Sequence, residues 1–430
     1  MTGSLVFPEH GFIAVKPIQH GLGGSTDLPI PFLYAMVGAS WALTISFAVL
    51  ALAWKEPRFV DAAEPVERAR RPWLGAVGAV VAVWILGALF LGPNQGNGGQ
   101  QAIYIFVWVG LVPLALLCGH VWRDLSPWRS IQAGVGRLTG HPDGVLTYPV
   151  RLGYWPAAAG LLAFVWLELA SPDPGSVSAM CWWVAIYSAV TLVGGVLFGP
   201  TWFDRADPFD VYSRVVAQLS PFVKDGRWVL HNPLRTLPSV PIHPGLVAVL
   251  AVLLGSTAYD SFSASEFWQA RTLSGAAHTA TLIGFCLVVA LLFVGAAMAT
   301  GGVSVQERRR LPGLLAHSLV PIVVGYIFAH YLTYLLEKGQ QAFYALLDPF
   351  GQGWQPLGDP GISYFLSTHT STLAALKVGF VVAGHVLAVI AAHDKALALL
   401  PRAHRLTGQL AMLVLMVVYT FTGLFLLFSV

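Results

Sequence analysis

The chain alternates between long apolar runs and shorter segments that carry nearly all of its charges. A helix of about 20 apolar residues crosses the hydrocarbon core of a bilayer. By that criterion the sequence predicts about ten membrane-spanning helices, of which the sixth is short. The predicted spans are 32–54, 74–91, 102–122, 152–170, 179–199, 246–258, 279–300, 314–336, 372–392 and 408–428. We therefore expect an all-α, polytopic integral membrane helical bundle.

The distribution of positive charge predicts the orientation of these spans. Cytoplasmic loops of membrane proteins are enriched in lysine and arginine. With the N-terminus outside, the five inner loops hold all of the 24 basic residues except Lys16, Arg271, Lys338 and Lys377. The sequence thus predicts an N-out, C-out topology. Residues 1–31 then form an extracytoplasmic segment, 32–430 a single transmembrane domain and 337–371 an extracytoplasmic loop.

Two inner loops, at 119–151 and 199–235, repeat one pattern. Trp122 and Asp124 match Trp202 and Asp204, and an amphipathic segment follows in each copy. Ser126 and Asp207 are good helix N-caps because each precedes a proline at the first helical position. We expect both loops to form helices on the cytoplasmic membrane surface, in a parallel internal repeat of helix pairs.

Composition supports the membrane assignment and excludes other classes. Hydrophobic residues make up 56% of the chain and charged residues 10%, whereas charged residues are about a quarter of an ordinary soluble protein. The net charge of +3 is spread over the loops rather than gathered in one patch, so we expect no nucleic acid partner. The three cysteines lie in apolar runs without metal-site spacing.

The eighth predicted span carries a stripe of polar residues. Tyr326, His330, Tyr334 and Glu337 follow one another at intervals that place them on one face of an α-helix. Polar groups at that depth are costly unless they are paired or used. The stripe therefore predicts a proton relay or a solute pathway.

Histidines in this span and the next suggest a bound metal or redox centre. Judged by their depth in the membrane, the candidate ligands fall into one set in the inner half of the bundle and another at its outer face. His330 could belong to either set. The inner set is His317, His385 and His393; the outer set is His278, His369, Glu337 and Asp260, joined by His20 and Asp27 of the N-terminal segment. Met412 and Met416, spaced four apart in the last span, would add soft ligands suited to copper.

Haem is the alternative to copper. His317 and His330 lie 13 residues apart, the spacing expected of two stacked haems, but His385 and His393 lie only eight apart. A single haem between His317 or His330 and one histidine of the next span stays open. A tyrosine, histidine and glutamate relay would need no cofactor at all.

Three segments resemble a known family. They are 20–32 (HGLGGSTDLPIPF), 201–214 (TWFDRADPFDVYSR) and 384–397 (GHVLAVIAAHDKAL). These segments resemble a bacterial family of polytopic membrane proteins that sometimes carries the label fenitrothion hydrolase. The resemblance implies a similar many-helix fold and an organophosphate-ester hydrolase activity, and it assigns no catalytic residues. Neither an H-E-x-x-H nor a G-x-S-x-G hydrolase motif occurs in the chain.

The sequence thus predicts a multi-pass protein of the bacterial plasma membrane with a buried histidine site for copper or haem, linked to a respiratory or metal-handling system. Three alternatives stay open. The first is a transporter of a small solute or ion, with Tyr326, His330 and Glu337 on its pathway. The others are a membrane-embedded hydrolase and a non-catalytic subunit of a membrane complex with partner subunits.

Overall fold

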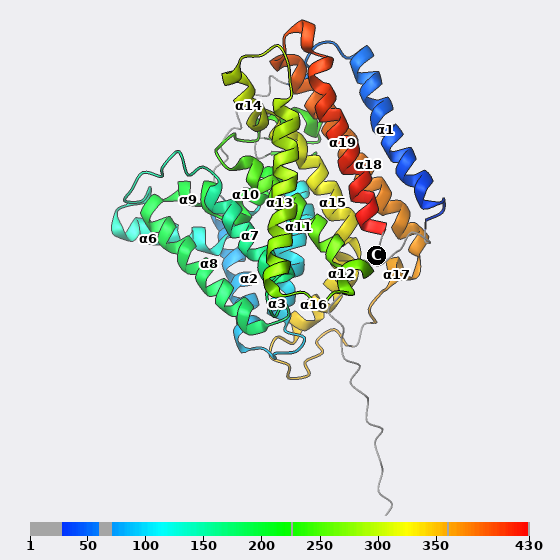
Figure 1. Cartoon of the computed structure of the whole chain (residues 1–430). Coiled ribbons are helices and arrows are strands. Elements are labelled where there is room, and N and C mark those ends of the chain that lie inside the picture. Colours follow the sequence, from blue (N-terminus) through cyan, green and yellow to red (C-terminus); the bar gives the residue numbers. More distant parts are fainter. Residues whose placement is uncertain (1–27, 60–70, 225–226, 359–360, 429–430) are drawn as a thin grey trace, which may run out of the picture.

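The computed structural model describes residues 28–59, 71–224, 227–358 and 361–428, and these are mostly helical (Figure 1). The helices of the first half are α1 (Phe32–Ala53), α2 (Pro72–Leu91), α3 (Gly98–Ala102), η2 (Ile103–Val109), α4 (Leu111–Cys118), α5 (Trp122–Leu125), α6 (Pro127–Thr139), α7 (Trp155–Leu169), α8 (Val177–Phe198), α9 (Pro200–Ala206) and α10 (Pro208–Ala217). Those of the second half are η3 (Pro233–Arg235), η4 (Leu237–Ser239), α11 (Leu246–Ser263), α12 (Glu266–Gln269), α13 (Gly275–Met298), α14 (Val305–Leu315), η5 (Ala316–Leu319), α15 (Val320–Thr333), η6 (Tyr334–Lys338), α16 (Gly339–Leu347), α17 (Phe365–Thr368), α18 (Thr370–Leu399), η7 (Arg402–His404), η8 (Thr407–Gln409) and α19 (Leu410–Phe428). Two strands of two residues, β1 (Val223–Lys224) and β2 (Arg227–Trp228), pair antiparallel.

Eight helices of the described residues are long and apolar enough to cross a membrane. A ninth span would be the pair Gly98–Val109 and Leu111–Cys118, which is bent by 46°. The remaining predicted span, 152–170, contains α7, an apolar helix of 15 residues. These helices identify a multi-pass membrane protein, while the count of ten and the N-out orientation stay predictions.

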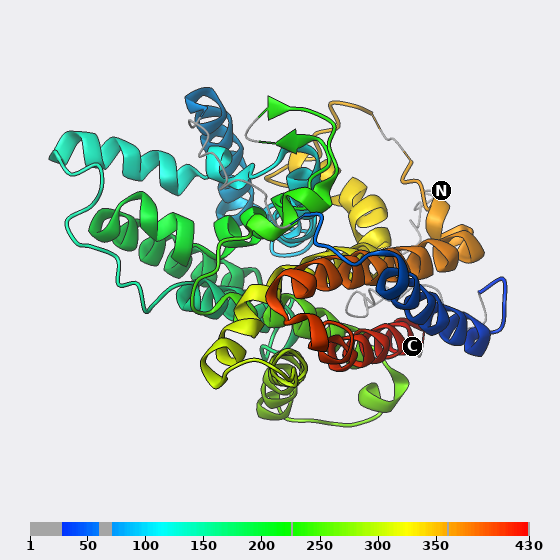
Figure 2. The same ribbon diagram turned by 90° about the horizontal axis from the view of Figure 1, so that it is seen from above.

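Two helices form the centre of the bundle. The continuous helical segment Val305–Leu347, which includes α15, is 83% buried over its most apolar stretch, and α11 is 72% buried. α15 packs against α18 and α11, and α11 packs against α13 and α7. Seen from above, α1 lies beside α18 and α19 on one side of the molecule, and α6, α8 and α9 lie on the opposite side (Figure 2). The central pair is where buried polar residues have the least access to water.

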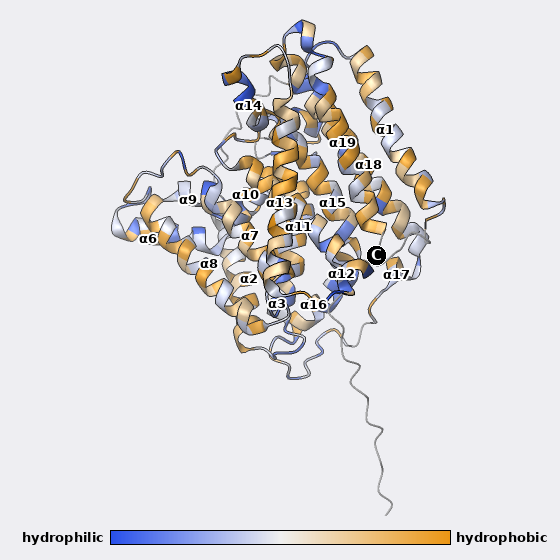
Figure 3. Cartoon of the chain, in the orientation of Figure 1, coloured by the Kyte–Doolittle hydropathy of each residue, from blue (hydrophilic) through white to orange (hydrophobic). Residues whose placement is uncertain are grey.

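The outer helices present apolar side chains on their exposed faces. The corresponding stretches of α1, α2, α8 and α13 are only 22% to 33% buried. In Figure 3 orange predominates on α13, and α1 and α8 alternate orange with paler residues. An apolar surface of this extent is unstable in water and stable in a hydrocarbon environment. The lipid bilayer is therefore the medium that surrounds this bundle.

α15 and α18 touch backbone to backbone. A Cβ atom placed on Gly325 would lie 2.5 Å from the carbonyl oxygen of Phe380, and one placed on Gly384 would lie 2.5 Å from that of Pro321. Both distances are shorter than any real Cβ contact. Small residues at such crossings let membrane helices approach closely. Glycine at these two positions thus sets the spacing of the central helices.

The two inner-loop units have the same local order of elements. α5 and α9 are short helices, and α6 and α10 follow them with Ser126 and Asp207 as side-chain N-caps and proline at the first position. The two units differ in burial. On α6, Ile131 and Leu138 are exposed, which suits a membrane-surface helix, whereas α10 is buried along nearly its whole length against α4 and α7. The apolar face of α10 thus packs on protein, and the position of both helices relative to the membrane stays a prediction.

Candidate functional site

The most connected buried polar group lies where α7, α11, α15 and two π-helices meet. We call it the central cluster, and its residues are Tyr104, Glu168, Asp260, Ser261, Tyr326, His330 and Tyr331. The π-helices are η2 and η6, which pack against each other. π-helical segments are rare and occur frequently at functional sites, because their extra residue per turn changes the direction of side chains.

Asp260 accepts two hydrogen bonds from the central helix. His330 Nε2 lies 2.9 Å from Asp260 Oδ2, and the Tyr331 hydroxyl donates to the same oxygen at 2.8 Å. All three side chains are almost fully buried. Asp260 stands near the end of α11, and consecutive residues of α15 reach it from one side. The carboxylate thus orients the imidazole and fixes a proton on its Nε2.

Ser261 completes the bonding of the imidazole. Its Oγ lies 3.0 Å from His330 Nδ1 and 3.1 Å from the Tyr326 hydroxyl, and it is also 3.2 Å from the carbonyl oxygen of Thr257. With neutral His330, the Ser261 hydroxyl donates to Nδ1. With protonated His330, Nδ1–H donates to Ser261 Oγ, and the hydroxyl proton turns to the Thr257 carbonyl. Both protonation states of His330 are therefore fully hydrogen-bonded.

Glu168 lies beside this network and has a different environment. It is the penultimate residue of α7 and the only charged residue of the run 152–170. Both of its carboxylate oxygens are buried without a hydrogen-bond partner among the described residues. Asp260 is near enough for its charge to act on the Glu168 carboxyl. The central cluster thus contains one carboxyl group that is hydrogen-bonded, Asp260, and one without a hydrogen-bond partner among the described residues, Glu168.

The predicted polar stripe does not hold together as a single row. Tyr326 and His330 belong to the central cluster, but Glu337 turns away and accepts hydrogen bonds from the backbone N–H and hydroxyl of Ser367. The cause is η6, whose π-helical turn begins at Tyr334 and shifts the residues after it from the α-helical face. Tyr331, which was not part of the predicted stripe, lies before this turn and donates to Asp260.

The other predicted outer residues lie apart from Asp260. His278 Nδ1 is 3.0 Å from the Tyr259 hydroxyl, and its ring packs edge-on against Trp268. His369 is exposed at the start of α18 and stacks on Phe365 with ring centroids 4.2 Å apart. His20 and Asp27 lie outside the described residues. The outer set therefore does not form one group in the part of the chain that the structure covers.

The inner histidines are dispersed as well. The Nδ1 atoms of His317 and His385 bond to the carbonyl oxygens of Leu314 and Val381 in their own helices. His393 bonds with both ring nitrogens, to Gln409 Oε1 at 2.8 Å and to the Trp54 carbonyl oxygen at 3.0 Å. These contacts make His393 a link between α18, η8 and the end of α1. The three inner histidines thus have separate packing roles.

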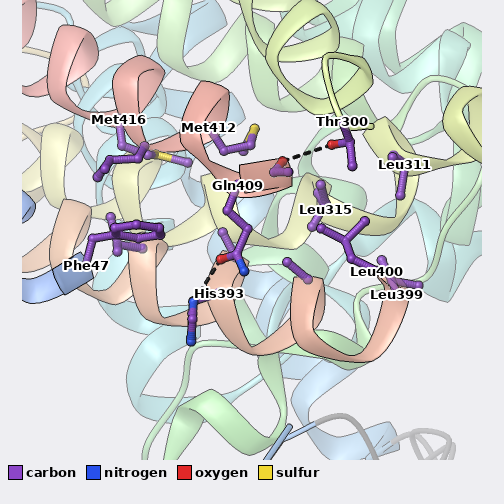
Figure 4. A pocket seen from close by; sticks show the side chains of 15 residues that line it. Phe47, Thr300, Leu311, Leu315, His393, Leu399, Leu400, Gln409, Met412 and Met416 are labelled. Carbon is purple, nitrogen blue, oxygen red and sulfur yellow. Dashed lines mark hydrogen bonds between the residues drawn. The ribbon is translucent and has the colours of Figure 1, made fainter. Parts of the chain in front are cut away.

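Met412 and Met416 line an apolar pocket together with His393 (Figure 4). In Figure 4 the hydrogen bond of His393 runs to Gln409 and not toward either methionine. Across the described ranges, no group of three or more histidine, cysteine, aspartate or glutamate residues is placed to hold a metal ion. The copper and haem sites that the sequence suggested, which also include Met412, Met416 and residues outside the described ranges, stay predictions.

A second buried polar group, the inner-loop ion network, joins the two repeated units. Arg129 Nη2 lies 2.8 Å from Asp204 Oδ1 and 2.9 Å from Asp210 Oδ2, and Arg214 Nη2 is 3.0 Å from Asp204 Oδ1. His120 Nε2 lies 2.9 Å from Asp210 Oδ1. Burial would raise the pKa of Asp210, but the charges of Arg129, His120 and Arg214 hold it well below its usual range. Each buried aspartate of this network therefore has a cationic partner.

Asp207, next to this network, has no such partner at hydrogen-bond distance. Its Oδ1 accepts hydrogen bonds from Phe209 N and from the Tyr187 hydroxyl, both at 3.0 Å. Burial, and next the charge of Asp210, raise the pKa of Asp207 to about 7. The carboxyl of this N-cap therefore changes charge near neutral pH.

Sequence reasoning missed Glu168, Ser261, Tyr331 and Tyr104. A signal for Glu168 was present, since a single carboxyl inside an apolar run indicates a functional residue. Compared with known proteins, the chain matches no family model, no curated protein and no solved structure. Fold and site together define a multi-pass membrane protein with a buried histidine, carboxylate and tyrosine cluster.

Proposed function

We propose that the protein is a membrane transporter that couples proton movement to a small solute or ion, with His330 as the residue that takes up and releases the proton. The supporting observation is the position of His330 between Asp260 and Ser261 inside the bundle. Histidine is the side chain whose charge changes most readily near neutral pH. Since Ser261 can donate to His330 or to Thr257, proton uptake at Nδ1 breaks no hydrogen bond of the ring.

The surroundings of His330 support the same role. Tyr326 extends the network from Ser261, and Tyr331 shares Asp260 with the imidazole. Ionisable residues inside membrane helices are expensive and mark ion or proton pathways. His393 also bonds through both ring nitrogens, but its partners are an amide and a backbone carbonyl. His330 differs because one of its partners is the Asp260 carboxylate.

The test uses full-length protein reconstituted in separate liposome preparations that contain sodium or potassium salts. A concentration gradient of the cation is imposed across the membrane, and internal pH is followed with a fluorescent dye. We expect proton movement above that of protein-free liposomes, and a loss of about tenfold or more in His330→Gln, since general acid–base residues contribute factors of this size. His385→Gln, which alters another buried histidine of a central helix, should keep the wild-type rate. Equal rates for His330→Gln and wild type would refute the assignment.

Copper and haem stay predictions from the sequence. Both ring nitrogens of His330 are engaged, so a metal at His330 requires that the Asp260 or Ser261 bond breaks first. Elemental analysis and an oxidised-minus-reduced visible spectrum of the purified protein decide this. Stoichiometric copper or a haem band would replace the transporter proposal with the redox one. The hydrolase activity, the bacterial plasma membrane and partner subunits likewise stay predictions.

A further inference from the structure

Glu168 is the buried carboxyl that the proton relay leaves unused. It lies one residue before the end of α7, and the segment that follows leads directly into a loop at the end of the bundle. Both carboxylate oxygens are buried and make no hydrogen bond among the described residues. An ionised carboxylate in such a position is strongly unfavourable unless a cation or hydrogen-bond donors compensate it. The group therefore needs a positive partner or a proton.

Tyr104, a polar neighbour of Glu168, also has no hydrogen-bond partner among the described residues. The Tyr104 side chain is 7% exposed, its hydroxyl has no hydrogen-bond partner in the described ranges, and the charge of Glu168 acts on it. Tyr104 comes from η2, so the rare π-helix brings this hydroxyl to the end of α7. The Tyr104 ring packs on Phe164, one turn before Glu168, so two polar groups without hydrogen-bond partners among the described residues lie in the same region.

The charges around Glu168 select the sign of a ligand. Among the described residues, the charge that acts on the Glu168 carboxyl is that of Asp260, and no lysine or arginine acts on it. Aromatic rings lie near Glu168. The ring centroid of Phe164, one turn before Glu168 on α7, is 5.8 Å from that of Tyr104 and 5.4 Å from that of Trp108. Carboxylate oxygens and aromatic faces both attract cations. The site therefore suits a positive ligand and repels an anion.

We propose that Glu168 is a cation-exchange group, which holds a proton in the described conformation and releases it when a monovalent cation binds between its carboxylate oxygens and the Tyr104 hydroxyl. The cation is an alkali ion or a small protonated amine, which share a single positive charge and an affinity for oxygen ligands. One proton leaves as one cation enters, so the charge of the site is unchanged. This inference rests on the proposed function, and it gives the chemical class of the ion whose binding would be coupled to proton release.

The experiment uses the full chain purified in detergent at pH 7.5, with N-methyl-D-glucamine as the bulky reference cation. Sodium, potassium and methylammonium chloride are added at constant ionic strength. Thermal unfolding is followed by tryptophan fluorescence, and proton release by a pH indicator. We expect at least one of the three cations to raise Tm saturably, because a ligand of the folded state stabilises it. The same cation should release up to one proton per chain. Comparison of the three cations shows whether the site takes an alkali ion or a protonated amine.

Three variants decide whether Glu168 is responsible. Glu168→Gln should lose both the Tm response and the proton release, whereas Glu266→Gln, which alters an exposed carboxyl on α12, should keep both. Tyr104→Phe removes one neutral ligand and should keep the proton release while it requires about fivefold more cation. If Glu168→Gln fails to fold, Tyr104→Phe decides the question alone, and an unchanged affinity in it would overturn the proposal.

The outcomes separate this inference from the proposed function. His330→Gln should retain the cation response in detergent while it loses proton movement in liposomes. If no cation stabilises the wild type, or if Glu168→Gln responds as the wild type does, the cation site is wrong. Proton movement that depends on His330 would then still support the transporter.

Discussion

The inner-loop ion network and the central cluster both bury carboxyl groups, but they compensate the charge differently. In the network, Arg129 and Arg214 lie within 3.0 Å of Asp204 and Asp210. In the central cluster, Asp260 is bonded to His330 and Tyr331, and Glu168 has no hydrogen-bond partner among the described residues. A fully paired buried charge holds elements together, whereas an unpaired one is retained for what it binds.

The largest effect on stability is expected from breaking the network. Arg129→Gln leaves Asp210 buried without its closest arginine, and removal of one partner from a buried ion pair costs about 3–5 kcal/mol. We therefore expect a large fall in Tm, measured in detergent by tryptophan fluorescence. Arg137→Gln, at an exposed position of the same helix, is the matched control and should leave Tm unchanged. A small effect of Arg129→Gln would mean that the network does not stabilise the fold.

An intermediate effect, dependent on pH, is expected at Asp207. Its folded-state pKa is about 7, above the ordinary value of 3.8, so the folded protein holds this proton more tightly than the unfolded chain. The resulting stabilisation is complete below about pH 4 and is lost as the pH rises through 7. Asp207→Asn should therefore raise Tm at pH 8.5 by several degrees and change it little at pH 5.

The control for this prediction is Asp173→Asn, which changes an exposed carboxyl outside the network. Its Tm should follow the wild-type protein at both pH values. An Asp207→Asn variant that is less stable than the wild type at pH 8.5 would contradict the raised pKa.

The smallest effect is expected at Glu168. Glu168→Gln replaces a carboxyl that has no partner with a neutral group of the same shape, so the free energy of unfolding without added cation should change by about 1 kcal/mol or less. The measurement is the same thermal scan, in the reference cation. A loss as large as that of Arg129→Gln would show that Glu168 has a structural role, and the contrast between the two regions would disappear.

Apolar runs predict most of the helices because the bilayer imposes both length and hydrophobicity on a span. They do not predict what an amphipathic helix packs against. The pattern of α10 is compatible with a membrane surface or with a protein interior, and only the tertiary structure shows that α10 is buried. Likewise, Arg129 and Asp204 are 75 residues apart, and nothing local links them.

The central cluster was predictable in part. Tyr326, His330 and Asp260 were expected on chemical grounds, since polar groups deep in a membrane protein need partners. The direction of Glu337 was not, because a π-helical turn is invisible to a periodicity of 3.6 residues. Ser261 was not expected either, since a hydroxyl in an apolar run is common and becomes significant only beside a histidine.

The glycine contact between α15 and α18 would limit how the proposed transport cycle can operate. Gly325 and Gly384 bring the two backbones together with no side chain between them, so sliding or rotation of one helix would bring side chains into collision with the other backbone. The two helices are therefore expected to move as one rigid body that carries His330. In the proposed cycle, access to His330 would then be opened by the helices that pack around this pair.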